Sequence, residues 1–252
     1  MLLEQTIDKL NAMKLFGLAQ ALDQQLASKE SARLSFDDRL SLLVDSEWNY
    51  REQRKLKRRL DAAKLRYQAS LEDVDFKHPR SLDRQQVLSL GNCGWIRNRH
   101  NLVITGPTGI GKSYLACALV ERACRRGITA GYVRLPRLLQ QLAVARGDGS
   151  YARILARLAK FELLAIDDWL LAPLRDPERR DLMEVVEDRS ERASTLIACQ
   201  PPSKDWHAAI GDPNIADAIC DRLLHNAHRI DLKGPSIRST KTSPKIPTGT
   251  GV

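Results

Sequence analysis

The chain has 252 residues, 43% of them hydrophobic, and a formal net charge of +9 at pH 7. Such a length suffices for one α/β nucleotide-binding domain and a smaller appendage, and the hydrophobic content excludes a disordered chain. No run of uncharged apolar residues approaches the length of about 18 that a membrane-spanning helix needs. The N-terminus lacks the features of a secretory signal, so we expect a cytoplasmic protein. The positive charge favours a polyanionic partner such as nucleic acid over an ordinary solvated basic surface.

The first 70 residues are predicted to be helical. Apolar residues recur at three- and four-residue steps, such as the step from Leu18 to Leu22, and no strand pattern interrupts them. Ser35 is expected to cap a helix with acids in its first turn, and the apolar stripe of that helix continues to Tyr67. We therefore predict a small all-helical domain over residues 1–70, which would bind DNA or a protein partner.

One stretch of this helical region is strongly basic. The segment Arg51–Arg66 contains eight Lys or Arg residues against two acids. A solvated helix face normally mixes signs so that charges pair at i,i+4, and the acids for such pairing are few here. We therefore favour binding to the phosphate backbone of duplex DNA over a solvated face. The residues expected to contact DNA are Arg51, Arg54, Lys55, Lys57, Arg58 and Arg59.

The rest of the chain alternates strands and helices. Residues 69–82 lose helical periodicity and contain Pro79, which predicts a linker over 71–82. Beyond it, strands are predicted at 101–105, 128–135, 163–166, 195–199 and 229–232, with helices at 84–90, 112–126, 136–145, 151–160 and 178–191. This alternation predicts an α/β domain over 83–234, with a parallel sheet flanked by helices. The stretch 235–252, rich in Ser, Thr, Pro and Gly, is expected to be a disordered tail.

A glycine-rich loop joins the first predicted strand to the next helix. It matches the P-loop pattern G-x-x-x-x-G-K-[ST] in the context of strand before and helix after, and this signal is strong. Glycines let the backbone amides point at phosphate oxygens, and the helix N-terminus adds partial positive charge. Lys112 would reach the β- and γ-phosphates of ATP, and Ser113 would offer its hydroxyl to Mg²⁺. The predicted nucleotide contacts are Gly106, Pro107, Thr108, Gly109, Ile110, Gly111, Lys112, Ser113 and Tyr114.

Two carboxylates follow the third predicted strand. Asp167 and Asp168 come directly after the apolar run Leu163–Ile166. At that position Asp167 could hold Mg²⁺ opposite Ser113, and Asp168 could polarise the attacking water. An acidic turn that closes the strand is the alternative. A GTPase is disfavoured because the chain has no Asn-Lys-x-Asp segment to recognise guanine.

Five widely spaced cysteines, without a Cys-x-x-Cys pair, fit reduced thiols better than a disulfide framework. Cys220, His225 and His228 form no common zinc-binding pattern, so a metal there is disfavoured.

The last third of the chain carries a family resemblance. The segment Gly211–Gly234 closely resembles one in the IstB-like helper ATPases of bacterial insertion sequences, which are relatives of the DnaC helicase loaders within the AAA+ class. The resemblance covers nearly the whole chain, since it includes Leu-Glu-Asp-x-Asp-Phe at 71–76, the P-loop and Leu-Leu-x-x-Asp-Asp-Trp at 163–169. A P-loop alone is unspecific, but this combination is specific.

The resemblance implies roles for single residues. Lys112 and Ser113 match the Walker A pair, and Asp167 matches the Walker B ligand of Mg²⁺. Asp168 stands where most AAA+ proteins carry glutamate, which implies slow hydrolysis. Gln200 occupies the sensor-1 position.

Two arginines are implied to act at subunit junctions or as sensors. Arg222 resembles the arginine finger that one subunit offers to the ATP of its neighbour; a surface ion pair with Asp221 or Asp217 is the alternative. Arg238 is a candidate second sensor.

The resemblance implies an ATP-dependent, slow ATPase that assembles with copies of itself on duplex DNA and delivers or regulates a transposase. Three alternatives stay open. The helical domain could grip a replicative helicase, as in a DnaC-like loader. A small-molecule kinase would use the same P-loop but leaves the basic helix unexplained. A DNA clamp could switch on ATP binding alone, given the short side chain of Asp168.

Overall fold

A computed structural model of the chain describes residues 2–237. It divides into two compact units, Met1–Arg59 and Leu60–Val252.

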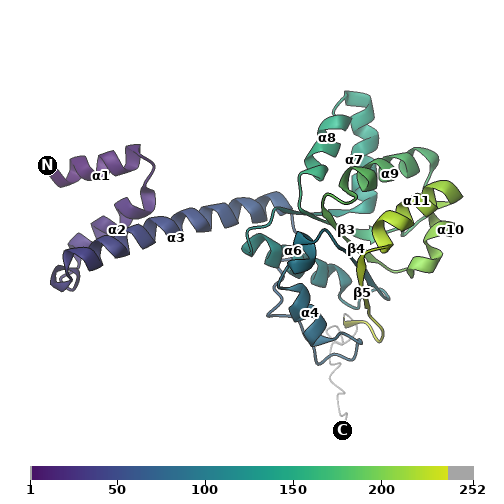
Figure 1. The fold of residues 1–252 in the computed structure, drawn as a ribbon, viewed down its shortest axis with the longest axis horizontal. Helices are drawn as coiled ribbons and strands as arrows, with labels where there is room; N and C mark the ends of the chain where they lie inside the picture. Colours follow the sequence, from purple (N-terminus) through teal and green to yellow (C-terminus); the bar gives the residue numbers. More distant parts are fainter. Residues whose placement is uncertain (1, 238–252) are drawn as a thin grey trace, which may run out of the picture. The chain divides into compact units, whose positions relative to one another are not determined.

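The first unit is all helical, as predicted (Figure 1). It contains α1 (Leu2–Ala12), α2 (Phe16–Ala27), a 3₁₀ turn (Ser31–Arg33) and most of α3 (Phe36–Ala63). The hydroxyl of Ser35 accepts from the amide of Asp38 at 3.2 Å, which caps α3. The buried carboxylate of Glu47 on α3 accepts from the amide of Leu18 at 3.1 Å, so it satisfies a free donor in the first turn of α2. Gly17 lets the two helices approach, because an added Cβ would lie 2.6 Å from the Cβ of Tyr50.

The second unit is built on a five-stranded sheet with the strand order β2-β3-β4-β1-β5. The strands are β1 (Asn101–Thr105), β2 (Ala130–Arg134), β3 (Leu163–Trp169), β4 (Ser194–Cys199) and β5 (Ala227–Asp231). Every pair of neighbours is parallel. The carboxyl ends of all strands therefore lie at one edge of the sheet and their amino ends at the other, and ligands of such sheets bind at the carboxyl edge.

Helices cover both faces of this sheet (Figure 1). They are α4 (Arg84–Leu90), α5 (Gly94–Arg97), α6 (Lys112–Arg125), α7 (Leu135–Asp148), α8 (Tyr151–Ala159), α9 (Asp176–Arg189), α10 (Trp206–Ile210) and α11 (Pro213–Leu224), with a 3₁₀ turn at Ser203–Asp205. The core beneath α7 to α11 contains Trp169 and Trp206, both fully buried, with ring centroids 5.2 Å apart. These features confirm the α/β fold with a parallel sheet flanked by helices.

The linker region differs from its prediction. Residues 71–82 belong to the same compact unit as the sheet, and the side chains of Leu71, Val74 and Arg80 are buried. The division between the units falls inside α3, after Arg59. Pro79 and the lost periodicity thus mark an irregular segment that packs on the fold.

Two other predictions concern the chain's end and the membrane. Arg238 and most of the tail predicted at 235–252 lie outside the described residues. Within residues 2–237, no helix is long and apolar enough to cross a membrane.

Candidate functional site

The P-loop follows β1 and runs into α6. Gly106, Gly109 and Gly111 have φ values of 144°, 81° and 98°, a region that glycine enters at little cost. A Cβ at Gly111 would lie 2.4 Å from Nη1 of Arg80, and one at Gly106 would lie 2.5 Å from the carbonyl oxygen of Leu232. The loop therefore needs its glycines for conformation and for space. It leads into the N-terminus of a 14-residue helix, which is a favourable place for an anion.

A cavity of about 690 Å³ opens beside this loop. Most of the residues predicted for ATP binding and hydrolysis line it: Thr108, Gly109, Gly111, Lys112, Ser113, Tyr114, Asp167, Asp168 and Gln200. Gly106, Pro107 and Ile110 do not line it, and the buried Ile110 anchors the loop from beneath. The volume lies in the range of about 300–1,000 Å³ that is usual for small-molecule sites.

Lys112 is the first residue of α6 and is nearly buried. Its Nζ donates to the carbonyl oxygens of Gly106 at 2.7 Å and Pro107 at 2.9 Å. The ammonium thus lies against the loop that would hold the phosphates, and phosphate oxygens could replace these carbonyls as acceptors.

The two predicted carboxylates lie inside β3, not after it, and each has a partner on β2. The hydroxyl of Tyr132 donates to Oδ2 of Asp167 at 2.5 Å, and Nε of Arg134 donates to Oδ2 of Asp168. Burial and the hydrogen bond to Asp167 raise the pKa of Tyr132, so its hydroxyl remains a donor. Asp168 has a φ of 55° next to an irregularity in the β3–β4 register, which re-aims its side chain.

Oxygen atoms suited to Mg²⁺ are present in the cavity. Ser113 and Asp167 line it together, and hydroxyl, carboxylate and phosphate oxygens are the ligands that Mg²⁺ takes in phosphoryl-transfer sites. Within residues 2–237, no group of three or more His, Cys, Asp or Glu side chains could hold a metal by itself. Sγ of Cys220 lies 3.9 Å from Nδ1 of His207. His207 was not among the residues considered with Cys220 from the sequence, which were His225 and His228.

Several lining residues were not predicted, because they come from the end of the predicted helical domain, from the predicted linker and from β2. They are Arg66, Tyr67, Asp73, Asp75, Arg80 and Arg134. The guanidinium of Arg80 is 3% exposed and donates to the carbonyl oxygens of Ile110 at 3.0 Å and Asp75 at 2.8 Å. The only sequence signal for this wall is the family motif at 71–76, which marks the segment without giving it a role.

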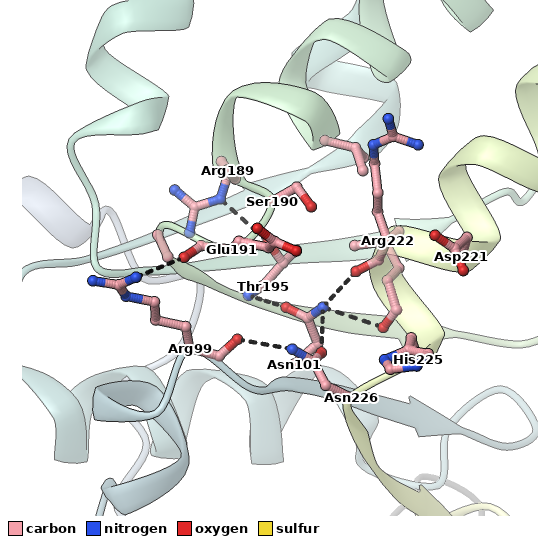
Figure 2. Close-up of a pocket in the computed structure, with 13 residues that line it drawn as sticks. Arg99, Asn101, Arg189, Ser190, Glu191, Thr195, Asp221, Arg222, His225 and Asn226 are labelled. Atoms are coloured by element: carbon pink, nitrogen blue, oxygen red, sulfur yellow. Dashed lines mark hydrogen bonds between the residues drawn. The ribbon is translucent and has the colours of Figure 1, made fainter.

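Arg222, on α11, does not line this cavity. Figure 2 shows it in another pocket, beside Asn101. Its carbonyl oxygen accepts from Nδ2 of Asn101 at 2.9 Å, and Asn101 begins the strand that the P-loop follows. The Arg222 backbone is therefore at the amino edge of the sheet, about 17 Å from the P-loop by the rise of a five-residue strand. Its Nε forms an ion pair with Glu187 at 2.6 Å. The ion pair considered from the sequence was with Asp221 or Asp217 instead. Arg222 therefore does not line the P-loop cavity of its own chain.

The predicted DNA-binding residues lie on α3, and some have partners. Arg51 pairs with Glu47 at 2.6 Å and Lys55 with Glu52 at 2.7 Å, so the acids are less scarce than the sequence count suggested. Arg54 stacks on Tyr50, 5.7 Å from its ring centroid, and Arg59 also has an interaction partner. Lys57 and Arg58 are exposed. The face remains strongly basic.

Known proteins similar to this chain identify its family and agree with its fold. A family model described as IstB-like ATP binding protein matches residues 8–245. The chain belongs to this family. An insertion sequence ATP-binding protein of Sinorhizobium fredii is 51% identical over 238 residues, which cover 94% of this chain and 97% of the relative. The ATP-binding protein of insertion sequence IS21 from Pseudomonas aeruginosa is 31% identical, over 94% of this chain and 88% of the relative.

Solved structures agree on the fold. The crystal structure of DnaI superposes with a TM-score of 0.56 at 20% identity, over 66% of this chain and 91% of that chain. The crystal structure of the DnaC helicase loader has a TM-score of 0.54 at 19% identity, over 68% of this chain and all of that chain. The protein is thus a member of the IstB-like ATP-binding proteins, and the fold of its second unit is like that of DnaI and DnaC.

Proposed function

We propose that this IstB-family protein is an ATPase that binds duplex DNA in the cytoplasm, assembles on it with copies of itself, and delivers or regulates the transposase of its insertion sequence. The observation that carries this proposal is the cavity beside the P-loop, which gathers Lys112, Ser113, Asp167 and Asp168. Its relatives are named for ATP binding in insertion sequences, which supports the link to transposition.

ATP hydrolysis would divide among these residues as follows. Lys112 and the loop amides hold the triphosphate, while Ser113 and Asp167 hold a Mg²⁺ ion, which neutralises phosphate charge when bound. Asp168 orients and polarises water, and Gln200 lies across the cavity at the end of β4. Because aspartate is shorter than glutamate and Arg134 engages Asp168, we expect hydrolysis to be slow until DNA or a partner binds.

DNA binding is assigned to the basic face of α3. The side chains of Arg54, Lys57 and Arg58 extend into solvent and form no ion pair with a carboxylate of the described residues, so they are available to phosphates. Contacts of this kind hold the duplex without reading its sequence.

The test measures duplex-DNA binding as a function of salt, together with ATP hydrolysis with and without DNA. Replacing Arg54, Lys55, Lys57 and Arg58 with Gln should weaken binding and reduce the log–log salt slope by about 0.9 for each phosphate that is no longer bound. It should also remove stimulation of hydrolysis by DNA. Lys112→Ala should abolish ATP binding while leaving the protein folded.

A matched control removes the same charge elsewhere in the first unit, by replacing Lys9, Lys14, Lys29 and Arg33 with Gln; all four are exposed. This control should retain most of the salt slope. Equal losses of DNA affinity and salt slope in both variants would show that net charge alone determines binding, and would contradict the assignment of DNA binding to α3. If the wild-type protein does not bind duplex DNA but binds a replicative helicase, the result would support the loader alternative instead.

A further inference from the structure

A second cavity, of about 310 Å³, lies along β2, which is an edge strand of the sheet. Its walls come from the end of α3 and the residues after it, from β2, and from α7 and α8. Five of its lining residues are basic and none is acidic. The basic residues are Lys64, Arg66, Arg134, Arg137 and Arg157. All belong to the second unit, whereas the basic face at α3 residues 51–59 belongs to the first.

The charge of this cavity is poorly compensated. Lys64, Arg137 and Arg157 are exposed, and none of them pairs with a carboxylate among residues 2–237. Other arginines of the same unit are paired: Arg122 with Glu72, Arg125 with Glu121, Arg146 with Asp181, Arg175 with Glu178 and Arg179 with Asp176. Like charges gathered in a concave site concentrate a positive potential, which attracts an anion.

The floor of the cavity is apolar and buried. Leu138, Leu158 and Leu164 are buried, and the ring of Phe161 lies against Gly131, where an added Cβ would be 2.7 Å from a ring carbon. Cations around an apolar floor fit a ligand whose charged oxygens face the cations and whose sugar carbons contact the floor, as in a nucleic-acid backbone.

We propose that the β2-edge cavity binds the phosphodiester backbone of duplex DNA, as a second DNA contact on the ATPase unit. The proposal rests on the proposed function in assuming that DNA is the anion. Guanidinium groups match phosphate oxygens in pairs, and four of the five cations here are arginines.

The position of this cavity links DNA to the nucleotide site. Arg66 and Arg134 line both cavities. Arg134 donates to Asp168, and Arg66 lies close enough to Tyr132 and Asp168 for these groups, with Tyr67, to raise its pKa against the opposing effect of burial. A phosphate in the β2-edge cavity competes with Asp168 for Arg134 and so frees the carboxylate that would polarise water. DNA bound here therefore raises hydrolysis in the neighbouring site.

The experiment replaces Lys64, Arg137 and Arg157 with Gln together, since these three line only the β2-edge cavity. Binding of a duplex of random sequence is measured across a salt series by full-length protein with a non-hydrolysable ATP analogue. We expect roughly tenfold weaker binding and a salt slope reduced by about 0.9 for each phosphate released from the protein. The ratio of hydrolysis rates with and without DNA should fall toward one.

Two variants make the result interpretable. The control replaces Arg126, Arg153 and Arg192 with Gln; these are exposed arginines of the same unit that line no described cavity, and Arg153 lies one turn from Arg157. It should keep most of the affinity. The charge-preserving variant Lys64→Arg, Arg137→Lys, Arg157→Lys should restore the wild-type salt slope.

The outcomes separate the two proposals. If the wild type binds duplex DNA but the Gln variant of the cavity matches the wild type or loses no more than the control, the cavity is not a DNA site, and the proposed function stands. If the wild type does not bind duplex DNA, the proposed function and this inference both fail.

Discussion

At the scale of single residues, the two carboxylates of β3 are each held by a side chain of β2. Arg134 lies directly opposite Asp167 in the strand register, yet its guanidinium bonds Asp168, because the irregularity after Ile166 shifts that residue. A carboxylate engaged by arginine accepts a hydrogen bond from water less readily. The pair thus restrains the group that we assign to water activation.

Removing this restraint should raise the slow rate of ATP hydrolysis. The Arg134 and Asp168 side chains are 39% and 20% exposed, so their ion pair is worth about 1 kcal/mol at most. Arg134→Gln should therefore raise the DNA-free rate of ATP hydrolysis up to about fivefold, as measured by steady-state phosphate release. Arg153→Gln, which removes the same charge on the exposed side of α8, should change nothing. A rate that falls in Arg134→Gln would mean that the arginine assists hydrolysis.

The sequence predicted the site residues that lie in one short segment. It missed the residues that reach the site through strand pairing or through the irregular segment before the sheet. Lys112 and Ser113 follow from one local pattern that places them at a strand-to-helix bend. Arg134, Tyr132 and Arg80 reach the site through strand register or through a segment without periodicity. No local pattern encodes those contacts, since they depend on which strand lies beside β3.

At the scale of elements, most helices and strands agree with their predicted positions to within a few residues. The strand predicted at 101–105 matches β1, and the helix predicted at 151–160 matches α8 to within one residue, because a glycine turn adjoins one end of each. Helices α5, α10 and α11 had no predicted range. The segment 71–82 was predicted as a linker, and its buried Arg80 instead connects it to the P-loop.

This connection should matter for ATP affinity. Burial lowers the pKa of Arg80, and its two hydrogen bonds to carbonyl oxygens hold the segment on the loop. Arg80→Met keeps the side-chain volume but removes these bonds, so the loop must be ordered by the ligand itself. We expect about tenfold weaker ATP binding, or roughly 1.4 kcal/mol, by calorimetric titration. Arg84→Met, at an exposed position nearby, serves as the control, and unchanged affinity in Arg80→Met would show that the loop holds its shape alone.

At the scale of the whole molecule, the parallel sheet separates two functional groups that ATP hydrolysis would need together. The P-loop cavity lies at the carboxyl edge, while Asn101 fixes the end of α11, and with it Arg222, at the amino edge. One copy of the chain cannot join them. A ring or filament of copies in head-to-tail contact would, since such contacts place one edge of a subunit against the opposite edge of the next.

Mixing defective subunits tests this arrangement. Arg222→Ala and Asp168→Asn proteins should each bind ATP and hydrolyse little. In a random equimolar mixture, a junction that takes its cavity from the Arg222→Ala subunit and its arginine from the Asp168→Asn subunit is intact, so about a quarter of junctions should recover activity. Lys112→Ala should complement Arg222→Ala in the same way, because their defects lie on opposite edges. It should not complement Asp168→Asn, since both defects fall in one cavity and every junction then lacks one of the two groups. Recovery in that last mixture, or none in the first two, would show that Arg222 does not complete a neighbour's site.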